Sequence, residues 1–186
     1  MKARILLIGA ALVGTTAMMA QDNQLSLGAD IALPLGDFGK AYSLGIGPTV
    51  GFEIPVGDNL GVTLQAGYDI MMVKSDQKDF IKSASMIPAQ VGLKYYFQDQ
   101  QEGFYAHGQL GIHNTSLKTK EQDLGLITIP SETSTSTNFS WALGVGYQLE
   151  SLDLGLRYNS ISPDSDAKGA KAASYIGLRI AYLIHL

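Results

Sequence analysis

The chain has 186 residues, no cysteine, 16% charged residues and a formal net charge of −4. This length suits one domain with a full core, and the lack of cysteine excludes disulfide bonds and thiolate-metal sites. The negative charge argues against a nucleic-acid partner.

Residues 1–20 have the layout of a secretory signal peptide. Lys2 and Arg4 precede an apolar stretch from Ile5 to Val13, and small residues follow up to Ala20. A buried N-terminal helix is the alternative interpretation. We expect cleavage after Ala20, which would leave one domain of residues 21–186 with a formal charge of −6.

The rest of the chain alternates apolar and polar residues with a period of two, which is typical of β-strands, and helical periodicity is not evident. The pattern predicts eight strands, at residues 24–34, 42–55, 60–72, 86–97, 104–114, 139–149, 152–160 and 173–186. The connections alternate between long and short, with long ones at 34–41, 73–85, 115–138 and 161–172. This alternation indicates an up-and-down antiparallel barrel whose two ends face different surroundings.

The two faces of these strands differ in charge. One face carries no charged residue, and the other carries seven, which we predict to form an interior charge network: Asp30, Glu53, Asp69, Lys94, Asp153, Arg157 and Arg179. An apolar face turned inward would make a soluble lipocalin-like carrier. However, the polar face is rich in glycine, for example Gly144, Gly146 and Gly155. Glycine weakens a solvent-facing strand but suits a crowded interior, so we expect the apolar face to point outward, toward lipid.

Aromatic residues on the apolar face gather near the strand ends. Six lie toward the short turns: Phe52, Tyr95, Phe97, Phe104, Tyr147 and Tyr182. Four lie toward the long loops: Tyr68, Phe139, Trp141 and Tyr158. Two such bands are typical of the aromatic girdles at the two interfaces of a membrane barrel.

Buried charges must be paired, so we predict specific partners within the barrel. Asp30 and Arg179 lie midway along the first and last strands, and we expect them to pair across the closing seam. Glu53 and Lys94 are expected to form a second pair. Pro48 and Pro88 cannot donate to a strand ladder, and we expect bulges or unpaired ends at these positions.

The chain resembles the small eight-stranded outer-membrane barrels of the OmpA/OmpX-like group, also described as an outer membrane protein β-barrel domain or porin family. The resemblance covers essentially the whole mature chain and lies in the pattern of ALPLGDF, GFEIPVGDNLGVTLQAGY, IPAQVGLKYYF, GFYAHGQLG, SLDLGLRY and SYIGLRIAYLIHL. It implies an all-β transmembrane barrel in the outer membrane of a Gram-negative bacterium. It also implies contact with outer-membrane lipid and with the barrel-insertion machinery during assembly.

Sites for chemistry are weakly indicated. His107 and His113 are too far apart along one strand to share a metal, and His185 lies at the end of another strand, so we expect no metal site and no cofactor. A lipid A-modifying enzyme would need a nucleophile, a base and an acid in contact. His113 with Thr115, Ser116 and Asp69 is a candidate set, but these residue types are common near any loop.

We therefore predict a non-enzymatic barrel with an interior filled by side chains, which serves as a structural anchor or binds partners through its loops. The segment Thr115–Asn138 is the expected site for an extracellular ligand. Met71, Met72 and Met86 flank the second long connection, where we expect them to pack at the rim. A narrow porin-like diffusion channel is the main alternative, followed by the soluble carrier and the lipid A-modifying enzyme.

Overall fold

The computed structural model describes residues 22–98, 101–123, 128–163 and 171–186, so the predicted signal peptide lies outside the described residues. The strands are β1 (Gln24–Leu35), β2 (Tyr42–Gly57), β3 (Leu60–Gly67), β4 (Asp69–Val73), β5 (Ile81–Tyr96), β6 (Gly103–Thr119), β7 (Gln122–Asp123), β8 (Thr128–Ile129), β9 (Thr133–Gln148), β10 (Leu152–Ile161) and β11 (Ala173–His185). A four-residue helix α2 (Phe38–Ala41) and a 3₁₀ turn η1 (Ser75–Gln77) lie in the long connections. None of the helices in the described ranges is long and apolar enough to cross a membrane.

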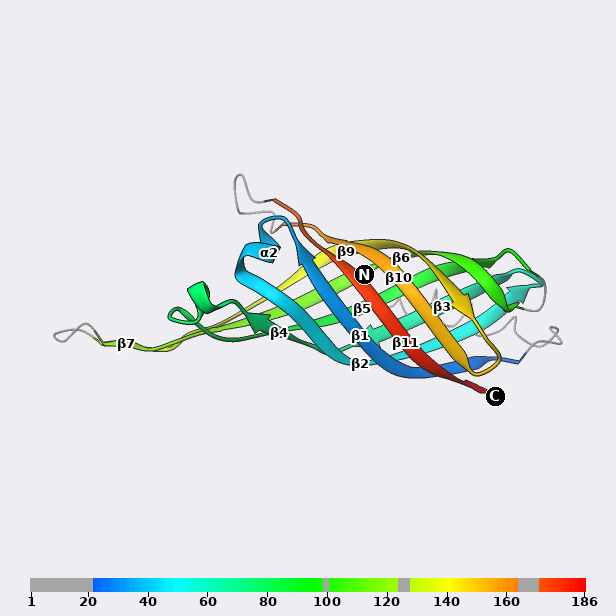
Figure 1. The fold of residues 1–186 in the computed structure, drawn as a ribbon, viewed down its shortest axis with the longest axis horizontal. Coiled ribbons are helices and arrows are strands. Elements are labelled where there is room, and N and C mark those ends of the chain that lie inside the picture. The colour runs from blue at the N-terminus through cyan, green and yellow to red at the C-terminus, as the bar shows by residue number, and fades with distance from the viewer. Residues whose placement is uncertain (1–21, 99–100, 124–127, 164–170) are drawn as a thin grey trace, which may run out of the picture.

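The strands close into an antiparallel barrel (Figure 1). Their order is β1-β11-β10-β9-β6-β5-β3-β2, and β1 pairs with both β11 and β2. β4 continues β3 in the same position between β2 and β5, so the wall has eight strand positions. All eight predicted strands are present, and closure leaves the barrel wall without a free edge.

The predicted strand 60–72 is interrupted at Tyr68, which separates β3 from β4. The interruption lies between the two prolines, because Tyr68 donates its N–H to the Pro48 carbonyl at 3.0 Å while the ring of Pro88 faces Gly67. Neither proline can donate to the ladder in return. The pairing register is the same on both sides of the break, so Pro48 and Pro88 do not form bulges, but both prolines are unpaired in the ladder on the side that faces β3 and β4, which is the other outcome that the prediction allowed. The prolines cost hydrogen bonds but do not shift the register.

The strands at the long-loop end extend further than the sequence pattern predicted. β6 continues to Thr119 and β9 begins at Thr133, and the two are paired as far as Lys118 opposite Thr133. β5 begins at Ile81 and pairs with β6 over the same length. We call residues 81–86, 115–119 and 133–138 the outer extension, which projects beyond the barrel toward β7 (Figure 1). The predicted loop 115–138 is therefore largely strand, because its Thr and Ser residues fit a β-ladder.

The barrel has its apolar face outward. Leu64, Leu93 and Leu143 are 53%, 56% and 62% exposed, although they lie in the middle of paired strands. The opposite face is buried and mostly polar, and it includes Asp30, Lys94 and Asp153. A soluble barrel would bury the leucines, so the lipocalin-like alternative is wrong.

An apolar cluster lies inside the barrel at the long-loop end. We call it the outer cluster, and its buried members are Ala32, Met71, Ala84, Met86, Ile161 and Tyr175. Phe38 of α2 packs against this cluster and contacts Tyr42 edge-on, with ring centroids 5.1 Å apart. The interior therefore has two parts, a polar one toward the short turns and an apolar one toward the long loops.

An exposed ion pair lies beside α2. The Lys40 ammonium donates a hydrogen bond to the Asp37 carboxylate, and this bond lowers the pKa of that carboxyl.

Candidate functional site

All seven predicted interior charges lie within the barrel with buried side chains. The structure divides them into two groups. A lower group of Glu53, Lys94, Asp153 and Arg179 lies toward the short turns, and an upper group of Asp30, Asp69 and Arg157 lies beyond it. The charges within each group come from strands that are far apart in sequence.

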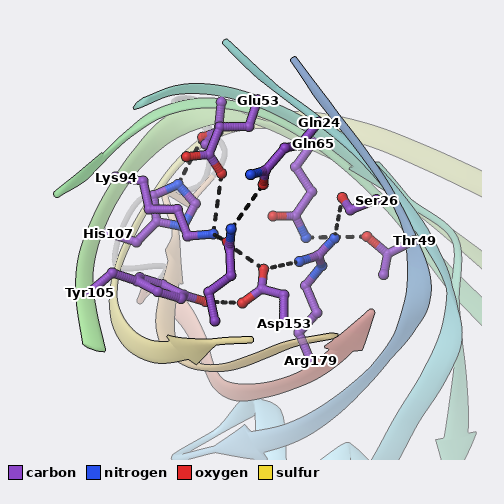
Figure 2. Close-up of polar contacts among 12 residues, drawn as sticks. Gln24, Ser26, Thr49, Glu53, Gln65, Lys94, Tyr105, His107, Asp153 and Arg179 are labelled. Atoms are coloured by element: carbon purple, nitrogen blue, oxygen red, sulfur yellow. Dashed lines mark hydrogen bonds and ion pairs between the residues drawn. The ribbon is translucent and has the colours of Figure 1, made fainter. Parts of the chain in front are cut away.

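The lower group is organised around Lys94 and Asp153 (Figure 2). The Lys94 Nζ atom lies 3.2 Å from Glu53 Oε2 and 3.5 Å from Asp153 Oδ2, and it donates to Gln148 Oε1 at 2.5 Å. Asp153 also accepts hydrogen bonds from Arg179 at 2.7 Å and from the Tyr105 hydroxyl at 2.6 Å. Because each charge has several partners, their burial is compensated, and the predicted Glu53–Lys94 pair is present.

The pairing of Asp30 differs from the prediction. Asp30 and Arg179 are register partners across the seam, but their charges do not pair with each other. Instead, Arg157 donates to Asp30 Oδ2 at 2.8 Å and Arg179 donates to Asp153. Arg157 reaches Asp30 past Gly177, which has no side chain to block the path. Arginine side chains are long enough to bypass the opposite residue, so register alone does not determine which charges meet.

Glycines make room for these side chains. A Cβ atom at Gly146 would overlap the Tyr105 ring, and one at Gly144 would lie 2.8 Å from Arg157 Cγ. A Cβ atom at Gly61 would overlap the Glu53 carboxylate. The glycine-rich face is therefore the face on which the large polar side chains need space.

Several uncharged residues complete the lower group and were not predicted from the sequence. The Tyr96 hydroxyl donates to Glu53 Oε1 at 2.7 Å, and Gln148 donates to Gln24 at 2.9 Å. The aromatic rings of Tyr96 and Tyr105 flank Lys94, whose Nζ lies 5.1 Å and 4.1 Å from the ring centroids. In the alternation along their strands, both tyrosines fall on the glycine-rich, inward face. A tyrosine on that face is the sequence signal that could have assigned them to the interior.

A small cavity lies in the polar part of the interior. Its volume is ≈ 30 Å³, and it is lined by Lys94, His107, Asp153, Arg179 and neighbouring side chains. This space suits a few water molecules rather than a continuous wide pore. The outer cluster lies between this region and the long loops.

The outer cluster is expected to contribute strongly to stability. Met86 is 1% exposed, so replacing it with alanine should leave a cavity and cost about 2–5 kcal/mol. Met72 is 47% exposed on the other face of the sheet, and the same replacement there should change stability by about 0.5 kcal/mol or less. Urea unfolding from lipid vesicles, followed by Trp141 fluorescence, measures both variants. Equal losses would contradict a packed outer cluster.

The histidines do not form a catalytic set. His113 Nε2 lies 2.8 Å from the Tyr175 hydroxyl, and His107 Nε2 lies 2.8 Å from the Thr63 hydroxyl. The Thr115 hydroxyl donates to the Ser136 carbonyl rather than to His113, and His185 is exposed at the end of β11. The candidate set His113, Thr115, Ser116 and Asp69 is therefore not connected by hydrogen bonds. Among the described residues, no group of three or more His, Asp or Glu side chains is placed to hold a metal.

The ten predicted girdle residues all have the parity of the outward face. Most are at least one-third exposed, and Phe104 reaches 64%. Several are in ring contact, with centroids 4.8 Å apart for Phe104–Tyr147 and 5.7 Å apart for Trp141–Tyr158. The first pair lies toward the short turns and the second toward the long loops, and the two interfacial bands remain a prediction.

Both outer strands of the outer extension have a stretch with a strand partner on only one side, namely β5 at residues 81–83, beyond its pairing with β4, and β9 at residues 133–138. β9 pairs with β6 from Thr133 onward, but its pairing with β10 stops at Ser140, opposite Ile161. The Phe139 carbonyl accepts a hydrogen bond from the Ser162 N–H, so the backbone N–H and C=O groups of Phe139 point toward the β10 side. Alternate residues of a strand direct these groups to the same side, so those of Thr133, Thr135 and Thr137 also point toward the β10 side. No strand among the described residues pairs with this side of residues 133–138.

Comparison with known proteins is consistent with this architecture. The model of a family described as outer membrane protein beta-barrel domain matches residues 8–182. No curated protein matches the chain significantly.

Three solved barrels of similar fold cover nearly the whole chain. Ail, the attachment invasion locus protein of Yersinia pestis, is 16% identical with a TM-score of 0.61, covering 89% of this chain and 100% of Ail. The N-terminal barrel of Pseudomonas aeruginosa OprF is 11% identical, with a TM-score of 0.57 and coverages of 88% and 98%. Neisserial surface protein A is 16% identical, with a TM-score of 0.55 and coverages of 88% and 97%. At these identities the similarity establishes the fold.

Proposed function

Because the chain belongs to the outer membrane protein beta-barrel domain family, we propose that it is a non-enzymatic surface anchor whose outer extension binds an extracellular protein. The protein is located in the outer membrane of a Gram-negative bacterium. In such barrels the short turns face the periplasm and the longer connections face the cell exterior. The outer extension then projects from the cell. In this proposal, delivery of the barrel to the membrane depends on the predicted signal peptide of residues 1–20 and on the insertion machinery.

The side of β9 that has no strand partner among the described residues carries the proposal, through the backbone groups of Thr133, Thr135 and Thr137. Its residues 133–138, TSTSTN, contain neither charge nor proline. Natural proteins usually protect an exposed strand edge with lysine, proline or a bulge, because free N–H and C=O groups attract another strand. An unprotected edge on a three-stranded ladder therefore suits the addition of an extended partner segment. The side chains of Thr133, Thr135 and Thr137 are exposed beside this edge and add hydroxyl groups for recognition.

The interior supports an anchor rather than a diffusion pore. Hydrogen-bonded side chains fill its lower part, and the outer cluster occupies its mouth. We also infer a non-enzymatic role, because His113, the only histidine in the upper interior among the described residues, bonds a tyrosine hydroxyl instead of a nucleophile.

Replacing Thr135 with lysine tests the binding edge. A long charged side chain beside the free backbone groups is expected to reduce strand addition at least tenfold, while the internal β6–β9 ladder is retained. Adhesion of cells that display the protein to a panel of immobilised serum and matrix proteins measures the loss.

The matched control is Ser75→Lys, which adds the same charge at an exposed position in η1, away from the edge. This control should adhere like the wild type. Equal adhesion of the wild type and Thr135→Lys, at equal surface expression, would contradict binding through β9.

A further inference from the structure

The upper group of interior charges is not neutral. In the lower group, Lys94 and Arg179 balance Glu53 and Asp153. In the upper group, Arg157 pairs with Asp30, and Asp69 is left without a base within ion-pair distance among the described residues. The ring nitrogens of His107 and His113 lie 2.8 Å from the neutral hydroxyls of Thr63 and Tyr175 respectively. With every carboxylate ionised and both histidines neutral, the interior has one unmatched negative charge.

Asp30 and Asp69 face each other across a glycine. Asp30 on β1 is the register partner of Gly47 on β2. On the other side of β2, a Cβ atom at Gly47 would lie 2.9 Å from the Asp69 Cα. The two carboxylates are thus two strands apart, with no side chain between them. Asp69 lies close enough to Asp30 and Arg157 to interact electrostatically with both.

One oxygen atom of each carboxylate has no partner. Asp30 Oδ1 and Asp69 Oδ1 are buried without a hydrogen bond, although Asp30 Oδ2 is bonded to Arg157. Asp69 is 2% exposed. The Asn159 amide, which lies near Arg157 around Gly177, also has unpartnered oxygen and nitrogen atoms. A buried carboxylate with an unpartnered oxygen atom and no base must be neutralised, either by a proton or by a cation.

We propose that the barrel interior binds one monovalent alkali-metal cation between the Asp30 and Asp69 carboxylates. Carboxylate and amide oxygens are the ligands that hard cations prefer. A single positive charge brings the upper group to neutrality, whereas a divalent ion would leave an excess positive charge next to Arg157. This site is independent of the outer extension, and its role is to stabilise the closed interior.

The test compares refolding and urea unfolding of the full chain in RbCl and in choline chloride, at equal ionic strength and fixed pH. A cation bound only to the folded state raises the folding equilibrium constant about tenfold for each tenfold rise in concentration above its Kd. We expect this dependence on Rb⁺ in the wild type and its loss in Asp69→Asn. Glu53→Gln is the matched control in the lower group, and it should be less stable while it keeps the Rb⁺ dependence.

Three results would contradict the proposed cation site. The first is equal stability of the wild type in both salts, and the second is an unchanged Rb⁺ dependence in Asp69→Asn. The third is a stability that depends on pH but not on Rb⁺, which would mean that a proton rather than a metal ion neutralises the carboxylates. If Asp69→Asn does not fold, anomalous scattering from wild-type crystals grown in RbCl decides the matter. A peak between the two carboxylates supports the proposal, and its absence there overturns it.

Discussion

Replacing Asp153 with alanine is expected to destabilise the barrel by about 3–5 kcal/mol, because it breaks a buried ionic network on one side. Asp153 accepts from Arg179 at 2.7 Å and from Tyr105 at 2.6 Å, and it lies 3.5 Å from Lys94 Nζ. Alanine would leave two cations in the lower group with only Glu53 to balance them. Urea titration of the protein in lipid vesicles, followed by the fluorescence of Trp141, the only tryptophan, measures the loss.

Glu150→Ala is the control for this experiment. Glu150 is exposed in the turn between β9 and β10, and its removal should change stability by about 0.5 kcal/mol or less. A loss at Asp153 as small as that at Glu150 would mean that water, rather than the protein, solvates the lower group. The interior would then be open to solvent, contrary to the filled barrel described above.

Placing arginine at Leu143 is expected to cost about 2–4 kcal/mol, since this position lies on the lipid-facing side near mid-membrane. Leu143 is 62% exposed and lies on β9 midway between the girdle residues Phe139 and Tyr147. A soluble barrel with the same exposed leucine would tolerate arginine there at almost no cost. The variant therefore tests directly which solvent faces the apolar side chains.

Leu149→Arg provides the comparison on the same face. Leu149 lies just past the end of β9, beyond Tyr147, and is 46% exposed. Near the interface the cost of arginine falls to about 0–1 kcal/mol. The same vesicle titration measures both variants, and equal costs at the two positions would contradict a membrane boundary close to Tyr147.

The sequence pattern was sufficient for the strands and for their two faces. A period of two assigns each side chain to a face through local backbone geometry, and glycine at positions such as Gly144 and Gly146 marked the crowded side. The pattern was less informative at strand ends. Polar Thr and Ser residues on both faces of 133–138 have no hydrophobic period, so the pattern predicts a loop where the structure has the β6–β9 ladder.

The contacts inside the barrel depended on tertiary structure. Asp30 and Arg179 are register partners, yet Arg157 reaches Asp30 and Arg179 turns to Asp153. Met71, Met86 and Tyr175 come from three different strands and meet only because the sheet closes on itself.

The alternation of residues along each strand therefore determined that this chain forms a barrel with an apolar outside and a charged inside, because that property is local. Which charges pair, which carboxylate remains without a base, and what fills the mouth were decided by the curvature and stagger of the closed sheet. These features bring together side chains that are far apart in the sequence, and side-chain length and the space left by glycine then select the partners.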